Sequence, residues 1–122
     1  MTLERINLGK YGEKLALKKI RSLGYKYITR NYRCHLGEID LIARDGDCLV
    51  FIEIKTRKGR SLSYAKEAID QRKMRQISKV ALAYMKANDC VDVRSRFDVV
   101  AVNINGDKEE VEVIPNAFDL AY

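Results

Sequence analysis

The sequence predicts a single α/β domain whose helices and strands follow one another in the order αβββαββ. The chain has 122 residues, which is enough for one core that buries roughly two thirds of the unfolded surface. Two segments place apolar residues at helical spacing, and five shorter ones have the alternating or apolar patterns of strands. One proline and seven glycines leave no room for a disordered linker, so we expect one domain over residues 1–122.

The first helix is expected over about residues 5–23, because apolar residues recur there at helical spacing and Gly24 follows as a stop signal. Gly9 and Gly12 lie beside the apolar stripe, although a glycine inside a helix costs about 1 kcal/mol relative to alanine. We interpret both glycines as positions where the helix backbone approaches a sheet closely. Glu13 lies at the edge of the same stripe.

Strands are expected where β-branched and apolar residues lie between turn signals. Arg44-Asp45-Gly46-Asp47 is expected to turn the chain between the second and third strands, and Asn105-Gly106-Asp107 between the last two. A second helix, over about residues 63–87, separates the third strand from the fourth. The five strand segments are residues 25–34, 38–44, 48–57, 96–104 and 110–115.

The hairpin of residues 37–58 carries acids where a structural hairpin would carry Thr or Val. If Asp45-Gly46 forms a two-residue turn, Glu38 lies opposite Glu53, and Asp40 becomes a diagonal neighbour of Glu53 on the same face. A bulge would shift this register by one residue, so the pairing stays open.

Carboxylates at neighbouring positions repel each other, and the surrounding Leu, Ile and Val would strengthen the repulsion by burial. Lys55 can compensate this charge, and so can a hard divalent cation, because Mg²⁺ prefers one or two carboxylates together with waters and phosphate oxygens. A cation held there would orient a water and stabilise charge on a phosphoryl oxygen, while Lys55 positions or helps to deprotonate the nucleophile. The alternative is a half-exposed hairpin with a surface Glu53–Lys55 pair. The metal site is favoured because Asp40 lies on the neighbouring strand and a basic helix follows.

The basic residues are distributed unevenly along a chain whose formal net charge is +6. Nine basic residues and two acids lie between Lys55 and Lys79, and six basic residues without an acid lie between Lys18 and Arg33. This asymmetry indicates a surface that faces a polyanion, nucleic acid before membrane, although a solvated basic surface would have the same composition. The candidate contacts with nucleic acid are Arg57, Lys58, Arg72, Lys73 and Arg75.

Cysteine and histidine usage argues against a zinc site or a disulfide framework. Cys34, Cys48 and Cys90 lack metal-ligand spacing, and His35, expected in a loop or at a strand end, is the only histidine. No apolar run is long enough to span a membrane, and residues 1–15 contain no apolar core of a signal peptide. We therefore expect a cytoplasmic protein without a membrane partner.

With these motifs in place, the chain resembles the YraN-like family of predicted endonucleases. These small bacterial proteins are grouped with the PD-(D/E)XK nucleases and are similar to archaeal Holliday-junction resolvases. The resemblance covers nearly the whole chain. The stretches that carry it are "GKYGEKLA", "NYRC", "GEIDLIARDG", "LVFIEIKTR" and "RFDVVAV".

The resemblance implies a restriction-endonuclease-like core, with a mixed central sheet flanked by helices, which matches the predicted order of elements. It implies that Asp40 is the first acid of the motif, Glu53 the second and Lys55 its lysine. Glu13 matches the acid that resolvases carry on their first helix, so the implied ligands of Mg²⁺ or Mn²⁺ are Asp40, Glu53 and Glu13. Ile39 replaces the proline of the motif, which removes no ligand. The implied activity is hydrolysis of DNA phosphodiester bonds, in branched or damaged DNA, by a protein that resembles dimeric resolvases and is therefore expected as a homodimer.

Two other functions compete with the endonuclease. One is a catalytically silent module that binds nucleic acid with the same fold, and the other is a domain whose hairpin acids bind a basic segment of a partner protein. The set of Asp40, Glu53 and Lys55 favours the enzyme over the binding module, because a binding module does not need this combination of residues. The basic helix argues against the protein-interaction domain. Arg96 and Asp98 are expected to form a structural ion pair at the start of a strand.

Overall fold

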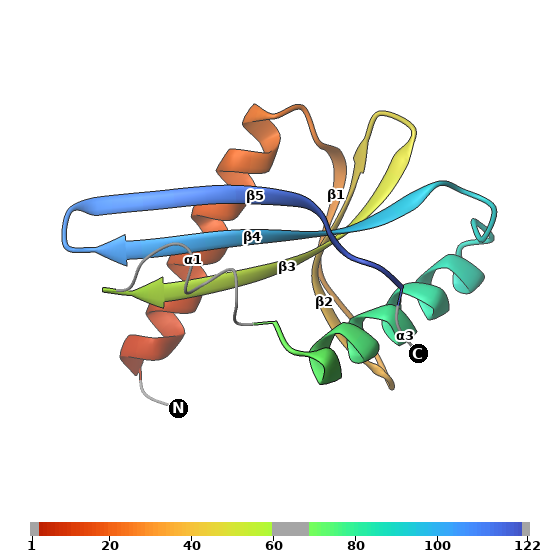
Figure 1. Ribbon diagram of the computed structural model, residues 1–122, viewed down its shortest axis with the longest axis horizontal. Coiled ribbons are helices and arrows are strands. Elements are labelled where there is room, and N and C mark those ends of the chain that lie inside the picture. Colours follow the sequence, from red (N-terminus) through yellow and green to blue (C-terminus); the bar gives the residue numbers. More distant parts are fainter. Residues whose placement is uncertain (1–2, 60–68, 121–122) are drawn as a thin grey trace.

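A computed structural model describes residues 3–59 and 69–120 and confirms the predicted α/β fold with the element order αβββαββ (Figure 1). A helix comes first, then three strands, a second helix and two further strands. The described helices and strands are α1 (Leu3–Ser22), β1 (Lys26–Cys34), β2 (Gly37–Asp45), β3 (Cys48–Lys58), α3 (Gln71–Ala87), β4 (Ser95–Asn105) and β5 (Lys108–Phe118).

The five strands form one sheet in the order β1-β2-β3-β4-β5. All neighbouring strands are antiparallel except β3 and β4, which are parallel, so the sheet is mixed as predicted. A parallel pair needs a crossover connection, and the segment that contains α3 provides it. Both features are consistent with a restriction-endonuclease-like core.

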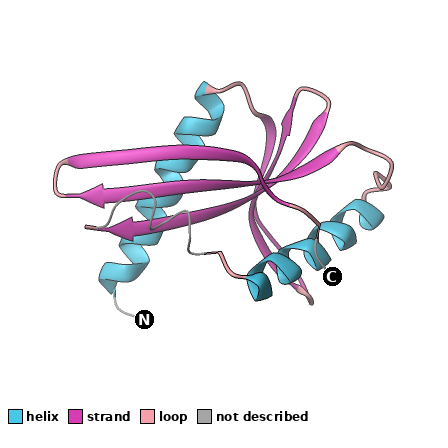
Figure 2. Cartoon of the chain, viewed as in Figure 1, coloured by secondary structure: helices cyan, strands magenta, loops and turns pink. Residues whose placement is uncertain are grey.

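The two helices pack on the two faces of this sheet, so β3 is covered on both sides (Figure 2). Alternate β3 residues therefore enter different cores, with Val50 and Ile52 on the α1 side and Leu49 and Phe51 on the α3 side. No helix in the described ranges is both long enough and apolar enough to cross a membrane. The other large side chains that are fully buried are Ile20, Ile39, Leu41, Ile42, Ile77, Val80, Val100 and Val102.

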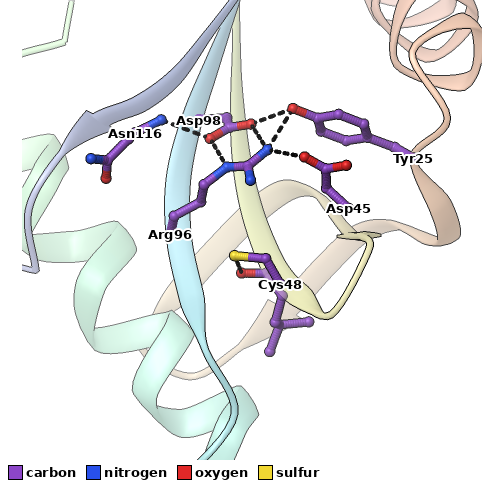
Figure 3. A network of polar contacts seen from close by, with 7 residues as sticks. Tyr25, Asp45, Cys48, Arg96, Asp98 and Asn116 are labelled. Atoms are coloured by element: carbon purple, nitrogen blue, oxygen red, sulfur yellow. Dashed lines mark hydrogen bonds and ion pairs between the residues drawn. The ribbon is translucent and has the colours of Figure 1, made fainter.

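The ion pair expected between Arg96 and Asp98 is present and belongs to a larger buried network (Figure 3). The Asp98 carboxylate, with 0% exposure, accepts from the Tyr25 hydroxyl at 2.7 Å, Arg96 Nε at 2.9 Å and the Asn116 N–H at 3.0 Å. Arg96 also donates to Asp45 at 2.8 Å. Burial, followed by the hydrogen bond to Asp98, raises the pKa of Tyr25 to about 12. These bonds join the ends of the strands, so the network holds the fold together.

The β2–β3 hairpin does not have the predicted register. Asp45 pairs with Cys48, so the two central residues of the turn are Gly46 and Asp47 instead of Asp45 and Gly46. Gly46 has a φ of +61°, as the first central position of a type II′ turn requires. The pairing therefore shifts by two residues. The expectation that Glu38 lies opposite Glu53 was wrong.

Two other expectations also need correction. The second helix begins at Gln71, because Asp70 is its N-cap with an extended backbone and accepts the Lys73 N–H at 2.9 Å. Residues 63–68 of the predicted helix lie outside the described residues. A Cβ at Gly12 would overlap the Thr56 side chain, which confirms a close approach of helix and sheet, whereas a Cβ at Gly9 would meet nothing within 4 Å. The interpretation of Gly9 was wrong because that turn of the helix faces open space.

Candidate active site

The corrected register brings Asp40 and Glu53 together. The pairing of β2 with β3 extends to Leu41 and Ile52, and the two acids next to these residues are joined by a side-chain hydrogen bond. Ile52 and Ile54 pack in the core under α1, so Glu53 between them points to the α3 side, where it contacts Lys73 of α3. The N–H of Ile54 donates to Asp40 Oδ2 at 2.8 Å, which fixes this carboxylate against the end of β3.

The two carboxyl groups lie in surroundings that disfavour two negative charges. Glu53 is only 6% exposed, and its pKa is raised from 4.5 to about 8 by burial first and by the charge of Asp40 second. Burial also raises the pKa of Asp40, and its hydrogen bond from Ile54 acts in the opposite direction. Without a further cation, the pair therefore retains a proton at neutral pH.

Two ammonium groups flank Glu53. Lys55 Nζ lies 4.0 Å from Glu53 Oε1, and Lys73 Nζ lies 3.9 Å from Glu53 Oε2. Sequence reasoning assigned Lys73 to phosphates and missed this contact with the acid. The available signal was Asp70, because an N-cap at that position places Lys73 in the first turn of α3.

Glu13 is not brought to the acid pair. Its Oε1 accepts from Arg30 at 3.2 Å and from Asn31 Nδ2 at 3.3 Å, both residues of β1. In the parts of the chain that the structure describes, no group of three or more Asp, Glu, His or Cys side chains could hold a metal ion together. The role of Glu13 as a third metal ligand stays a prediction.

A basic cleft of about 930 Å³ opens beside the acid pair. It contains five Lys or Arg side chains and one carboxylate, and two of the cations, Lys55 and Lys73, are also the neighbours of Glu53. His35, in the turn between β1 and β2 as expected, is exposed and also lines the cleft. The full lining is His35, Leu36, Lys55, Asp70, Arg72, Lys73, Arg75, Gln76 and Lys79.

The predicted nucleic-acid contacts divide into two groups. Arg72, Lys73 and Arg75 line the basic cleft, so the structure gathers them as the sequence suggested. Arg57 and Lys58 lie at the end of β3 and are not among the lining residues. The Arg57 side chain donates to the Thr56 carbonyl at 3.0 Å. Lys79 was not predicted, although it follows Arg75 by one helical turn.

The donor chemistry of the acid pair fits a hard divalent cation. Asp40 and Glu53 present carboxylate oxygens, and Mg²⁺ is typically held by one or two carboxylates with waters and phosphate oxygens as further ligands. A cation between them would replace the shared proton and offset the effects that raise the two pKa values, which are burial at both acids and the charge of Asp40 at Glu53. The adjacent basic cleft could then supply phosphate oxygens from a bound polyanion.

Comparison with known proteins identifies the family of this chain. A family model described as "Uncharacterised protein family UPF0102" matches residues 12–102, which include both acids, Lys55 and Lys73. A UPF0102 protein of Geobacter metallireducens is 43% identical over 122 residues, with both chains covered completely. One of Geobacter sulfurreducens is 47% identical over 116 residues, covering 94% of this chain and 91% of the relative. One of Caldicellulosiruptor saccharolyticus is 37% identical over 118 residues, covering 95% of this chain and all of the relative. The chain therefore belongs to the UPF0102 family, which agrees with the YraN-like family expected from its motifs, whereas the grouping with the PD-(D/E)XK nucleases stays a prediction.

Proposed function

We propose that this protein is a metal-dependent deoxyribonuclease of the PD-(D/E)XK type that hydrolyses phosphodiester bonds. The observation that carries the proposal is the pair of half-buried Asp40 and buried Glu53, with Lys55 beside it and a basic cleft next to it. Two facing carboxylates destabilise a hairpin, so stability gives no reason for placing them there. In metal-dependent phosphoryl transfer carboxylates hold the cation, and a lysine and a surface that binds phosphates position the nucleophile and the substrate.

Each residue of the site has a stated task in this proposal. Asp40 and Glu53 hold the metal, and the Ile54 N–H keeps the Asp40 carboxylate in one orientation. Bound Mg²⁺ or Mn²⁺ supplies the positive charge that activates a water and stabilises the phosphoryl oxygens. The Lys55 ammonium positions the nucleophile, and the cations of the cleft bind the phosphates on either side of the reacting bond.

The same proposal includes DNA as the substrate, with branched or damaged DNA among its forms. It also includes a cytoplasmic location and a homodimer. These parts rest on the resemblance to resolvases, and the basic cleft supports the nucleic-acid partner. Glu13 is the third acid implied by the resemblance. Because it is bound to Arg30 and Asn31, its contribution is best measured with the variant Glu13→Gln.

A nucleic-acid-binding module without catalytic activity is the second candidate, and one observation favours it. Lys55 and Lys73 already flank Glu53, so the fold supplies part of the compensating charge for this acid without a metal. The cleft could then bind phosphates while the acids serve only to orient the two ammonium groups. The two functions differ in whether a divalent cation leads to cleavage.

The test is incubation of purified protein with supercoiled, single-stranded and four-way-junction DNA in the presence of Mg²⁺, Mn²⁺ or EDTA. We expect metal-dependent cleavage of at least one form. Asp40→Asn and Lys55→Ala, purified in parallel, should abolish it, which also excludes a contaminating nuclease. Asp40→Asn leaves every cation of the cleft in place, so its DNA affinity should stay near wild type. If the wild type cleaves none of the three forms, the protein is the silent binding module.

A further inference from the structure

A second basic groove, of about 790 Å³, lies between α1 and β1. Its lining includes Lys10, Lys14, Lys18 and Arg21 from α1 and Arg30 from β1, and we call it the α1 groove. The cleft beside α3 shares none of these residues, and the two helices cover different faces of the sheet. The α1 groove is therefore a separate surface.

The four cations of α1 form a row along one side of the helix. Lys10, Lys14 and Lys18 are spaced by four residues, and Arg21 follows after three, so all lie on neighbouring turns. Like charges at this spacing destabilise a helix, so the helix alone gains nothing from the arrangement. The row spans about 16 Å at a rise of 1.5 Å per residue. One strand of a duplex places about four to five phosphates along that length.

The positive charge of this row is not compensated by neighbouring acids. Among the described residues that line the groove, Glu13 is the only one with a carboxylate, and it is paired with Arg30 at 3.2 Å. Within residues 7–59 and 69–120, whose side chains the structure describes, no Asp or Glu forms an ion pair with the four cations of the row. The groove therefore presents a net positive charge to any ligand that enters it.

The surroundings of the row favour a phosphate backbone over a lipid surface. A helix that lies on a membrane inserts an apolar face beside its basic residues. Here the apolar face of α1 packs against the sheet, with Ala16, Leu17 and Ile20 all buried. Leu17 also lines the groove but is only 5% exposed, so the groove offers its cations without an apolar side chain that could enter a bilayer.

We propose that the α1 groove is a second surface for the phosphate backbone of nucleic acid, used together with the cleft beside α3. The inference shares its nucleic-acid partner with the proposed function but requires neither metal nor cleavage. Arg30 of the groove lies on β1, and His35 of the cleft lies in the turn that follows it, so both surfaces border the same edge of the sheet. A nucleic acid that contacts both would follow that edge.

The test compares three triple variants by fluorescence anisotropy with a DNA duplex, in EDTA, over a range of salt concentrations. K14A/K18A/R21A removes the row and R72A/R75A/K79A removes cations of the cleft. The matched control, K86A/R94A/K108A, removes three exposed cations that line neither surface. Each lost phosphate contact reduces the slope of log affinity against log salt by about 0.9.

We expect the row variant and the cleft variant each to flatten the slope by about two to three units, and their combination to approach the sum. The control should keep the wild-type slope. A row variant that behaves like the control would overturn the inference. Circular dichroism and a melting curve verify folding, and K14R/K18R, which keeps both charges, should bind like wild type.

A second measurement uses vesicles that contain phosphatidylserine. If the row variant loses vesicle binding but keeps its DNA salt slope, the row serves a membrane, and the nucleic-acid inference is wrong. The nuclease proposal fails on a different result, which is that the wild type shows no metal-dependent cleavage. That result leaves the second surface supported if the row variant loses DNA affinity. Cleavage by a protein whose row has no effect on DNA affinity would support the nuclease and overturn the second surface.

Discussion

The Nζ atom of Lys73 lies 3.9 Å from Oε2 of Glu53, so a residue in the first turn of α3 contacts an acid of β3. Lys55 approaches the other oxygen of the same carboxylate at 4.0 Å. Both lysines also line the basic cleft. A phosphate that enters the cleft and the carboxylate of Glu53 therefore share the same two ammonium groups.

Replacing Lys73 by Met should raise the pKa of Glu53 above its value of about 8. Burial and the charge of Asp40 raise this pKa, and the positive charge of Lys73 counteracts them, so its loss leaves the raising effects less opposed. Arg75→Met is the matched control, because Arg75 lines the same cleft but, among the residues that the structure describes, is not one of the charged groups that act on Asp40 or Glu53. The measurement is a titration of the carboxyl ¹³C resonances by NMR. An equal pKa of Glu53 in wild type and both variants would mean that Lys73 does not act on Glu53 in solution.

The two helical glycines should respond in opposite directions to alanine. Gly12→Ala should destabilise the protein, because the new Cβ overlaps Thr56 and helix or strand has to move. Gly9→Ala should stabilise it by up to about 1 kcal/mol, because its Cβ meets nothing within 4 Å and alanine is the better helix former. Urea unfolding of both variants measures the difference. A stabilised Gly12→Ala would mean that α1 does not pack closely on β3.

The order of helices and strands was predictable because each element carries its own periodicity, and β3 with its alternate residues in two cores is the clearest case. The register of the β2–β3 hairpin was not predictable, since the sequence "RDGD" allows a two-residue turn at either of two positions. The two registers differ by two residues, so each side chain keeps its face of the sheet in both, and the alternation of apolar residues does not select the turn at Gly46 and Asp47. The start of α3 was missed because Asp70 can continue a helix or cap it.

The candidate site was predicted in part. Asp40, Glu53 and Lys55 lie on one hairpin, so their proximity follows from local sequence alone. Lys73 reaches the site only through the crossover between β3 and β4, and no local pattern reports which way its side chain points. The position of the Glu13 side chain depends on how α1 packs over β1, and in the structure this side chain is paired with Arg30 and Asn31.

In EDTA, the free energy of unfolding should fall as the pH rises from 4.5 to about 8. The pKa of Glu53 is higher in the folded state, so in this window the folded protein keeps a proton that the unfolded chain has released. More bound protons in the folded state mean that stability decreases with pH until the folded pKa is passed.

The variant Glu53→Gln cannot titrate, so its stability should depend less on pH over the same window. Asp92→Asn, which replaces an exposed acid between α3 and β4, is the control and should follow the wild type. Urea unfolding across the pH range gives the three slopes. If the wild type and Glu53→Gln have the same slope, Glu53 is ionised throughout the window, and its burial does not raise its pKa in solution.

Asp40 combines a structural contact with a destabilising charge, and two variants separate the two effects. Asp40→Asn removes the charge, while its amide oxygen can still accept the Ile54 N–H. Above the raised pKa of Glu53, where both acids are ionised, we expect Asp40→Asn to melt at a higher temperature than wild type in EDTA. Asp40→Ala leaves the Ile54 N–H without this acceptor, which costs about 1–3 kcal/mol and should lower the melting temperature.

The same two variants test the metal site. Mn²⁺ or Mg²⁺ at a hundredfold excess over the dissociation constant should stabilise the wild type by about 2.7 kcal/mol. Both variants should lose most of this gain, because each lacks the carboxylate that faces Glu53. Calorimetric melting curves with metal and with EDTA measure both effects on the same samples. If Asp40→Asn melts lower than wild type in EDTA and is still stabilised by Mn²⁺, Asp40 serves the fold alone and the cation binds elsewhere.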